Sequence, residues 1–376
     1  MKGIDTQLRK IKKRSHKFLT HSALLHWRRA LAQKRWRFVL VLAVGLVTGG
    51  IVLKLTLGKP SLITLQGEVM GTPYRIQYWD RWGWNYQEEV ESLLVRLHHD
   101  LSTASPDSEL AKFNAHDCSD FYVESPFLYP LITKSKEIYR NTAGAFDPTI
   151  LPLVDVWKDS AIDLDNLLVN TVRAPVSLDY IVANTQRIKK LKDGVKLDFR
   201  GILGGYAVDK IADLLHAHGI GCMRISLGSE AMDRGTSKKC KAWHIAIHPH
   251  VASSLDIDTE VMLTLENKAV AISSKHGEKS SNRNSIIDPT TGYPAQDTVL
   301  AAVVVGEDCS TVDAYATAMR VRGLAFAQAL LAQQENLAAF LIYEDDRGMP
   351  AFYASPSLHM QQNEHGIILK IAQKAP

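Results

Sequence analysis

Short apolar runs separated by charged turns fill the chain from Leu178 onward, and they constrain the fold more than any other feature. Each run is four to seven residues long, which suits a β-strand and is too short for a helix that buries a face. The runs cover residues 188–191, 195–199, 223–227, 244–247, 261–265, 269–273 and 299–305. Helical patterns at 206–218 and 311–320 interrupt them. This irregular order, with several apparent hairpins, indicates an α+β layer structure and not a regular doubly wound sheet.

Hairpin and helix patterns also occur between residues 65 and 144. Residues 67–79 alternate like a pair of strands, or like one strand with a turn at Gly71-Thr72-Pro73. Residues 85–102 place five apolar side chains on one face of a helix, namely Val90, Leu93, Leu94, Leu97 and Leu101. A further helix is predicted over 127–142, ending before Gly144. With 46% hydrophobic residues in 376, the chain can bury a sizeable core.

Residues 1–57 differ in composition from the rest. Residues 1–37 hold twelve Lys or Arg against one acid, Asp5, and residues 38–53 carry no charge. A cleavable signal peptide would have a shorter charged region, and a lipoprotein would need a Cys after the apolar run, whereas the first Cys is Cys118. The pattern predicts a basic cytoplasmic arm at 1–37, an uncleaved transmembrane anchor at 38–57 and a linker at 58–64. A buried core helix is the alternative.

The basic arm also predicts a compartment. By the positive-inside rule, the chain after the anchor lies outside the cytoplasm. A basic arm can bind nucleic acid, but before an apolar run it is better explained as a topology signal, so no nucleic-acid partner is expected. The cysteines, Cys118, Cys222, Cys240 and Cys309, are scattered without metal-binding spacing. Cys222 and Cys240 could pair if their strands are neighbours, which the sequence leaves open.

The segment LDFRGILGGYAVDKIADLL, Leu197 to Leu215, contains a glycine-rich turn between a predicted strand and a predicted helix. Glycines at such a turn let the backbone approach a ligand closely, and the N–H groups that begin the helix favour negative charge. A phosphate fits this arrangement. The alternative is that Gly204 and Gly205 only serve a tight turn beneath a packed helix.

Four further segments resemble binding elements more than scaffold. They offer Ser108, Glu109 and Asn114 at a helix start, Asp147 and Asp288 before prolines in loops, and Asp313 with Thr317 on a helix. Helix capping, Asp-Pro turns and a solvated helix face are the structural alternatives. The spacing of four puts the Asp313 carboxylate and the Thr317 hydroxyl on one face. Mg²⁺ beside a phosphate needs only one or two such oxygens from protein side chains.

In this order, these segments resemble the ApbE family of FAD:protein FMN transferases. The matching blocks lie between about residues 65 and 354, and they are VMGTPYRIQY, PDSELAKFN, GAFDPTILPLVDVW, LDFRGILGGYAVDKIADLL, IIDPTTGYP and TVDAYATAM. The resemblance implies a membrane-linked enzyme that attaches FMN from FAD, through a phosphoester, to a Thr or Ser of an acceptor flavoprotein and releases AMP. With the predicted anchor in the inner membrane of a bacterium, its enzyme domain would face the periplasm. It implies two entwined α/β subdomains with the flavin site between them, here at residues 65–360, before a C-terminal tail at 361–376.

The same resemblance implies roles for single residues. Asp313, Thr317 and the backbone carbonyl of Leu203 would hold Mg²⁺, and Asp288 would orient or activate groups near the phosphates. Contacts to FAD would come from Met70, Ser108, Glu109, Asn114, Asp147, Asp198, Gly204, Gly205, Gly228, Ser229 and Glu230. The acceptor would be a flavoprotein subunit of a membrane redox system.

Several positions depart from the family pattern. Relatives usually have Lys at the position of Gly204 and Gly-Asp at Ser229-Glu230. Lys275 stands at a usual glycine, Ser285 at a usual His and Ala104 at a usual Tyr. These changes remove a charge-assisted phosphate contact and the side chain best suited to proton transfer near neutral pH. Lys275 or His276 could supply what Gly204 and Ser285 lack.

Two hypotheses follow from this mixture. The first is a working transferase with a diverged site, favoured by the retained carboxylates and Thr317. The second is a catalytically degenerate relative that binds FAD, or only a protein partner. The Asp313–Thr317 pair does not decide between them, because it would also serve dinucleotide binding without transfer.

Overall fold

The computed structural model describes residues 36, 39–51, 59–69, 71–158, 165–235, 243–247, 261–274, 286–295, 298–363 and 366–371. The chain divides into two compact units, Met1–Ser61 and Leu62–Pro376, which are treated separately. In the first unit, residues 39–51 are helical, and the Thr48 hydroxyl donates to the Val44 carbonyl at 2.8 Å. No helix within the described residues combines the length and the apolar character needed to cross a membrane. The predicted anchor at 38–57 is described over 39–51 only, and it stays a prediction.

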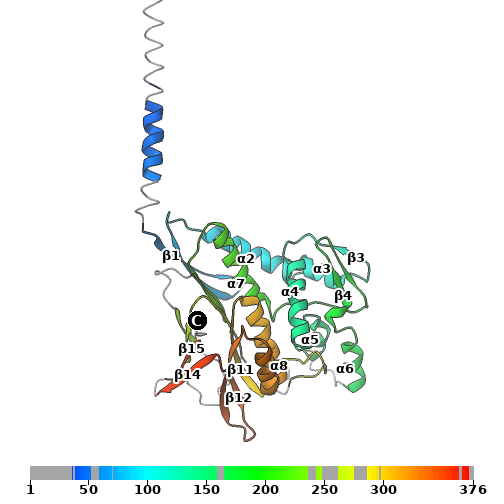
Figure 1. The fold of residues 1–376 in the computed structure, drawn as a ribbon. Helices are drawn as coiled ribbons and strands as arrows, with labels where there is room; N and C mark the ends of the chain where they lie inside the picture. Colours follow the sequence, from blue (N-terminus) through cyan, green and yellow to red (C-terminus); the bar gives the residue numbers. More distant parts are fainter. Residues whose placement is uncertain are drawn as a thin grey trace, which may run out of the picture. The chain divides into compact units, whose positions relative to one another are not determined.

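An eight-stranded sheet forms the centre of the second unit (Figure 1). Its strand order is β1 (Ser61–Val69), β2 (Thr72–Asp80), β6 (Met223–Leu227), β7 (Glu230–Arg234), β10 (Ala269–Ser274), β11 (Val299–Gly306), β12 (Ala338–Glu344) and β13 (Pro350–Ala354). Neighbouring strands from β2 to β13 pair antiparallel. The predicted hairpin at 67–79 and the predicted strands at 223–227, 269–273 and 299–305 are confirmed within one or a few residues at their ends.

Strand β11 is buried along its whole length because both faces of the sheet are covered there. One face carries the helices α7 (Leu203–Ala217) and α8 (Cys309–Gln333), and Ala302 and Val304 point into that core. Leu300 and Val303 point into a second core on the other face. A strand covered on both faces needs a continuous apolar run, which is the pattern of residues 299–305.

The second core lies beneath a four-stranded sheet in the order β14 (Leu358–Asn363), β15 (Gly366–Ile371), β9 (Val261–Leu265) and β8 (Trp243–Ile247). Strand β15 pairs parallel with β9 and antiparallel with β14, and its Ile367 and Leu369 are buried. The expectation of a tail at 361–376 is therefore corrected, because β15 completes this sheet.

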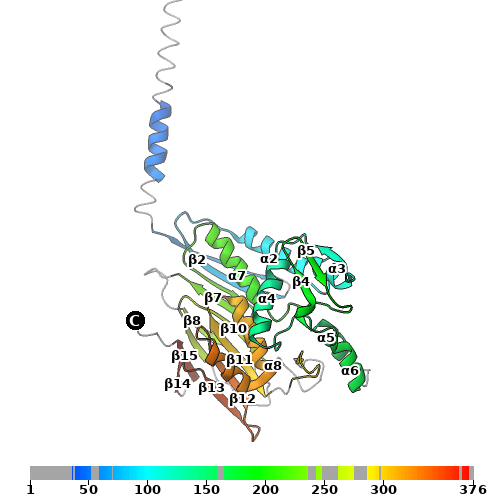
Figure 2. The ribbon, with the colours of Figure 1, turned by 45° about the vertical axis from the view of Figure 1, so that its right-hand side comes forward.

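The remaining elements form a helical part, drawn to the right in Figure 2. It contains α2 (Gln87–Leu101), α3 (Glu109–Ala115), α4 (Leu128–Asn141), α5 (Leu151–Lys158), α6 (Asn166–Arg173) and a short 3-10 turn at Leu178–Tyr180. A small sheet in the order β3 (Asp120–Tyr122), β5 (Arg187–Lys190) and β4 (Ile181–Ala183) joins them. The whole part is inserted between β2 and β6, which are neighbours in the large sheet. The chain re-enters the sheet layer through α7, directly after the glycine-rich turn.

Two predicted elements differ from the structure. Residues 195–199 form only an isolated bridge between Lys196 and Ile150. The backbone of Leu197 pairs instead with the side chain of Asn114, so no neighbouring strand is needed there. The helix expected over 311–320 extends to Gln333, although Gly323 interrupts its geometry with φ 80° and ψ −175°.

Candidate functional site

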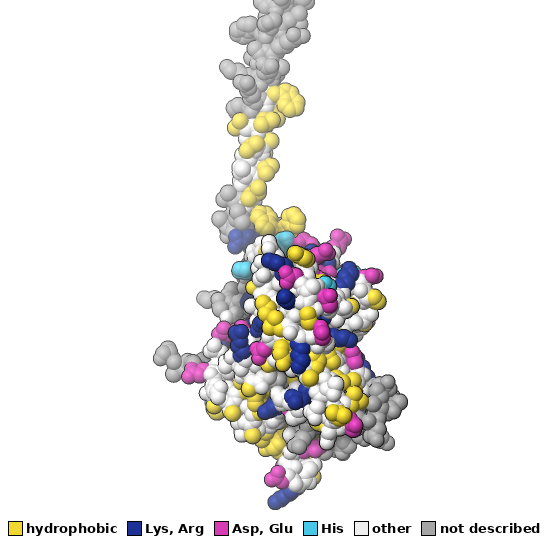
Figure 3. Space-filling view, turned by 90° about the vertical axis from the view of Figure 1, so that its right-hand side faces the viewer, with side chains coloured by type: hydrophobic (Ala, Val, Ile, Leu, Met, Phe, Trp, Pro, Cys, Tyr) yellow, Lys and Arg dark blue, Asp and Glu magenta, His cyan; other side chains and the backbone are white. Residues whose placement is uncertain are grey.

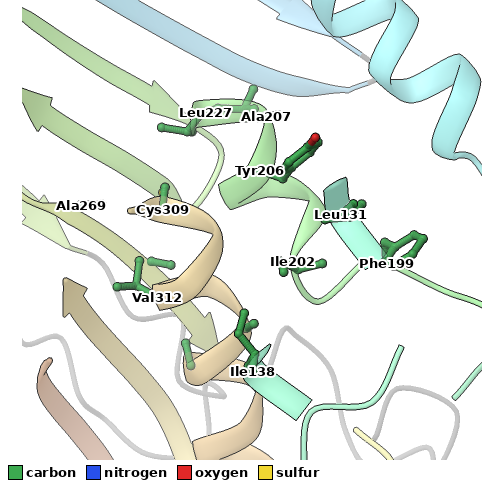
Figure 4. Packing of buried hydrophobic residues seen from close by; sticks show 14 of the residues in the cluster. Leu131, Ile138, Phe199, Ile202, Tyr206, Ala207, Leu227, Ala269, Cys309 and Val312 are labelled. Carbon is green, nitrogen blue, oxygen red and sulfur yellow. The ribbon is translucent and has the colours of Figure 1, made fainter. Parts of the chain in front are cut away.

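The first turns of α7 and α8 meet backbone to backbone (Figure 4). A Cβ at Gly205 would overlap the Cys309 carbonyl group, lying 2.6 Å from its carbon. The Gly205 N–H donates to Asp313 Oδ2 at 3.0 Å. In the other direction, the Asp209 carboxylate accepts from the N–H groups of Cys309 at 2.8 Å and Ser310 at 2.9 Å. Gly205 therefore has a packing role, because only a residue without a side chain permits this approach.

Three kinds of oxygen lie around the glycine turn. Asp313 is 8% exposed. The Thr317 hydroxyl, one turn further along α8, donates to the Gly201 carbonyl at 3.5 Å. The third kind is a backbone carbonyl: Leu203, whose carbonyl is the predicted donor, begins α7 between Gly201 and Gly205. The described residues contain no group of three or more His, Cys, Asp or Glu suited to a metal. A carboxylate, a hydroxyl and backbone carbonyls are nevertheless hard oxygen donors, the kind that Mg²⁺ accepts beside phosphates.

Burial controls the charge of this region. Burial raises the pKa of the Asp313 carboxyl well above its ordinary value, and the nearby Glu230 and Asp209 charges raise it further. Burial also raises the pKa of Glu230 to about 7. These carboxyls hold protons more tightly than in water until a cation or a donor compensates their charge.

The Glu230 carboxylate lies where a side chain at Gly204 would begin. A Cβ at Gly204 would lie 2.7 Å from Glu230 Oε2, and the Ser229 hydroxyl donates to Glu230 Oε1 at 2.8 Å. The departures from the family pattern at these positions are thus linked, because the Glu230 side chain occupies the place into which a longer residue at 204 would begin to extend.

A cavity of about 360 Å³ opens beside this pair. Gly204, Gly228, Ser229 and Glu230 line it, together with Leu94, Leu97 and His98 of α2. The volume falls within the range of small-molecule sites. The structure thus brings Gly204, Gly228, Ser229 and Glu230 together around one cavity, whereas Gly205 packs against α8, and their contacts to FAD stay predictions.

Ser108, Glu109 and Asn114 make internal hydrogen bonds. The Ser108 hydroxyl caps α3 by accepting from Ala111 N at 2.8 Å. The buried Glu109 carboxylate accepts from the backbone N–H groups of Glu124 and Ser125. The Asn114 amide donates to the Leu197 carbonyl at 2.8 Å and accepts from its N–H at 2.7 Å. These bonds hold α3 to its surroundings, and contacts of the three residues to FAD stay predictions.

Asp147 and Asp198 lie on the loops that support the glycine turn. Burial raises the pKa of Asp147 to about 6, and its carboxylate accepts from Thr149 N at 2.8 Å. Asp198 is 5% exposed and accepts from Arg200 Nε at 2.8 Å. Arg200 lines the 360 Å³ cavity. Arg200 was not among the predicted site residues, although its place in the sequence between Asp198 and Gly201 could have indicated a cation beside the glycine turn.

Asp288 lies in a separate, firmly held loop. Its Oδ1 accepts from Thr290 N at 2.8 Å and from the Thr290 hydroxyl at 2.7 Å. Arg322 Nη1 is 3.6 Å from Asp288 Oδ2. The Trp157 indole N–H fixes the loop further by donating to the Gly292 carbonyl at 2.9 Å. The role of Arg322 had not been foreseen, because its contacts depend on tertiary structure.

Some of the predicted positions lie outside the described residues. These are Met70, Lys275, His276, Ser285 and Cys240. Ala104 is described and exposed. Cys222 is disulfide-bonded, whereas Cys118 and Cys309 are free.

Solved structures with the same fold are flavin transferases. A Pseudomonas stutzeri flavinyl transferase ApbE in its apo form, 24% identical, has a TM-score of 0.69 over 80% of this chain and 96% of its own. The flavin transferase ApbE from Vibrio cholerae, 28% identical, has a TM-score of 0.67 over 79% of this chain and 98% of its own. The fold is thus the mixed α/β architecture of these transferases.

Sequence comparison defines the family. The ApbE family model matches residues 70–341. A curated FAD:protein FMN transferase from Vibrio cholerae serotype O1 is 28% identical over 311 residues, covering 78% of this chain and 91% of the relative. The corresponding Haemophilus influenzae protein is 27% identical over 310 residues, covering 77% and 89%. The chain belongs to the ApbE family, which confirms the resemblance drawn from its six sequence blocks.

Proposed function

We propose that this protein is an FAD:protein FMN transferase that attaches FMN to a Thr or Ser of an acceptor flavoprotein and releases AMP. The observation that carries the proposal is the glycine turn itself: Gly204 lines the cavity with Gly228, and its chain neighbours Gly205 and Gly201 contact Asp313 and Thr317. The relatives that share the fold and nearly their full length with this chain are named for the same reaction.

The oxygen donors suit a Mg²⁺ ion, which Asp313, Thr317 and the Leu203 carbonyl would hold. Bound there, Mg²⁺ would screen the pyrophosphate and stabilise the charge that develops on the leaving phosphate. The Gly205 N–H holds the Asp313 carboxylate in place. Asp209 holds the beginning of α8. Both contacts fix the donors before FAD arrives, and fixed donors favour one geometry of the phosphates.

In the transfer step, the acceptor hydroxyl oxygen attacks the flavin-side phosphorus of FAD. A phosphorus–oxygen ester bond forms, and the bond from that phosphorus to the bridging oxygen breaks. AMP leaves with the bridging oxygen and its electron pair. Asp288 would accept the hydroxyl proton through Oδ2, since Oδ1 already accepts two hydrogen bonds from Thr290.

A second candidate function is dinucleotide or partner binding without transfer. Glu230 favours it, because this carboxyl group lies against Gly204 on the cavity wall where a pyrophosphate is expected. Ionised, it would repel the phosphates in the absence of a cation. A protein that kept the fold and lost the chemistry would tolerate such a residue.

The proposal includes a location, the periplasmic side of a bacterial inner membrane with a single anchor at residues 38–57. The twelve basic residues before the apolar run support it. The disulfide at Cys222 supports it too, because disulfides persist in oxidising compartments. The acceptor would then be a flavoprotein subunit of a membrane redox system on the same side.

The test uses the full chain in detergent with FAD, Mg²⁺ and an acceptor domain bearing a Ser/Thr-Gly-Ala-Thr type of target. We expect flavin fluorescence on the acceptor in a denaturing gel, with the Vibrio cholerae transferase as positive control. Asp288→Ala and Asp313→Ala should abolish the signal, whereas Asp107→Asn, at an exposed position, should leave it unchanged.

An unlabelled acceptor beside a labelled control would contradict transfer to this target. Isothermal titration with FAD would then separate the two functions. Tight FAD binding without transfer would favour the binding protein. If the protein neither bound FAD nor transferred FMN, a role in dinucleotide binding would also be contradicted.

A further inference from the structure

The loop between β2 and α2, residues 81–86, carries two exposed tryptophan side chains and is called the tryptophan loop below. The Trp82 side chain is 41% exposed and that of Trp84 is 61% exposed. Tryptophan is highly buried on average in folded proteins, so two such rings on one loop indicate an interaction surface. Figure 3 shows hydrophobic side chains, in yellow, at the upper end of the second unit.

Buried polar groups hold the backbone of the tryptophan loop. Asp80 is 6% exposed, and its Oδ2 accepts from the N–H groups of Trp82 and Trp84, both at 2.8 Å. The Tyr78 hydroxyl donates to the Trp84 carbonyl at 2.8 Å. Gly83 lies between the two rings with φ 75°, a conformation that glycine adopts without strain. The backbone is thus ordered before any partner arrives, which lowers the entropic cost of binding.

The tryptophan loop lies at the end of the second unit where β1 begins. Strands β1 and β2 are neighbours in the large sheet, and Gln77 Nε2 donates to the Thr64 hydroxyl at 3.4 Å between them. In an antiparallel hairpin with this pairing, the first residue of β1, Ser61, lies close to the last residue of β2, Asp80. Leu62, which follows Ser61, is 50% exposed.

The length of the chain before β1 limits how far this end can lie from a membrane. Only residues 58–60 separate the predicted anchor at 38–57 from Ser61. A chain of that length spans at most about 14 Å, even when fully extended. The headgroup layer on each side of a bilayer is about 5–8 Å thick. If the anchor crosses the bilayer, the tryptophan loop is therefore within reach of the headgroups, where indole rings are enriched in membrane proteins.

We propose that the tryptophan loop inserts Trp82 and Trp84 into the headgroup layer of the phospholipid bilayer that holds the anchor. This inference rests on the membrane location proposed above and adds a second contact to it. An indole suits that layer, because its ring is apolar and its N–H can donate to lipid oxygens. A single span limits the distance of the second unit from the bilayer, and the second contact also limits its orientation.

The experiment measures quenching of tryptophan fluorescence with the full chain in vesicles of phosphatidylcholine and phosphatidylglycerol. The quencher is a lipid that carries a nitroxide on its headgroup. The chain has seven tryptophans, so differences between variants assign the signal. The double variant Trp82→Phe with Trp84→Phe should lose about half or more of the fluorescence that the lipid quenches. Trp157→Phe, on α5, removes one emitter from the helical part and should leave the quenched fluorescence unchanged.

Equal quenched fluorescence in the parent and the double variant would overturn the inference. If the chain were then a dimer in lipid nanodiscs, and the two rings were also shielded from aqueous iodide, a second copy of the chain would cover the loop. Flotation of the vesicles keeps the proposals apart. A chain that floats without loop quenching loses only the second contact, and a chain that does not float loses the membrane location and the inference together. Flavin transfer, measured in the same preparations, tests the enzyme independently of both.

Discussion

Helix α8 carries two regions of opposite chemistry that are held in different ways. Its first turns present Asp313 and Thr317, fixed by the backbone of the glycine turn. The turn before Gly323 presents Arg320 and Arg322, and Arg322 is held by the side chains of Thr290 and Asp288. Backbone contacts tolerate little change in shape, whereas side-chain contacts near solvent can be altered at small cost. The first region is therefore expected to tolerate less change in shape than the second.

The contact between α7 and α8 offers the strongest test of that difference. Gly205→Ala should lower the free energy of unfolding by about 3 kcal/mol, because the new Cβ meets the Cys309 backbone, which cannot rotate away. Urea unfolding followed by circular dichroism measures the loss. Gly221→Ala is the matched control, since a Cβ there has no neighbour within 4 Å. Equal stability of the two variants would show that the helices separate easily.

Asp313→Asn should weaken Mg²⁺ binding in the presence of FAD by about 100-fold, because the charge of the carboxylate is lost while its shape remains. The amide oxygen can still accept from Gly205 N, so the fold should persist. Isothermal titration gives the affinity. If Mg²⁺ bound the variant as tightly as the parent protein, the cation would have to lie elsewhere.

Asp147, on the loop between α4 and α5, predicts a pH dependence. Its ordinary pKa of 3.8 is raised to about 6 by burial, so the folded chain binds the proton more tightly than the unfolded chain. Its stabilising contribution is fully present below pH 3.8 and is lost as the pH rises through about 6. Over that interval the stability of the parent should fall relative to Asp147→Asn by on the order of 3 kcal/mol.

Urea midpoints between pH 4 and 7.5 measure this difference, with exposed Asp107→Asn as the control. Parallel pH profiles for the parent and Asp147→Asn would mean that the carboxyl keeps an ordinary pKa and contacts water.

The smallest effect is expected at Arg322. Arg322→Gln should change the free energy of unfolding by about 0.5 kcal/mol or less, because its ion pair with Asp288 is long and its side chain is 38% exposed. Thermal unfolding beside Arg75→Gln, the same change at an exposed position of β2, measures it. A loss of several kcal/mol would make Arg322 a structural clamp and erase the contrast between the two regions of α8.

Sequence patterns predicted the elements whose burial is periodic. Residues 223–227 alternate between buried and partly buried positions, and the predicted strand matches β6. Residues 195–199 have a similar pattern and form no strand, because Asn114 binds the Leu197 backbone from 83 residues away. Local periodicity cannot show that a distant side chain supplies the partner. The long α8 was underestimated because the helix continues after Gly323.

The candidate site was predictable to a similar degree. The glycine turn and the Asp313–Thr317 spacing are local signals, and the structure brings them together. The contact of Glu230 with Gly204 and that of Arg322 with Asp288 join residues far apart in the chain. Neither contact has a signature in spacing, since each depends on how a helix packs beside a strand or a loop.

The insertion between β2 and β6 also affects how the chain folds. Tyr74 pairs with Leu227, 153 residues further along, so β2 has no partner on that side until the whole helical part has been made. Closing so large a loop is entropically costly and slows the formation of the central sheet. Until then, the unpaired edge of β2 is open to pairing with other chains. Compact folding of the inserted helices, which shortens the distance between the two strands, is therefore expected to limit aggregation of the newly made protein.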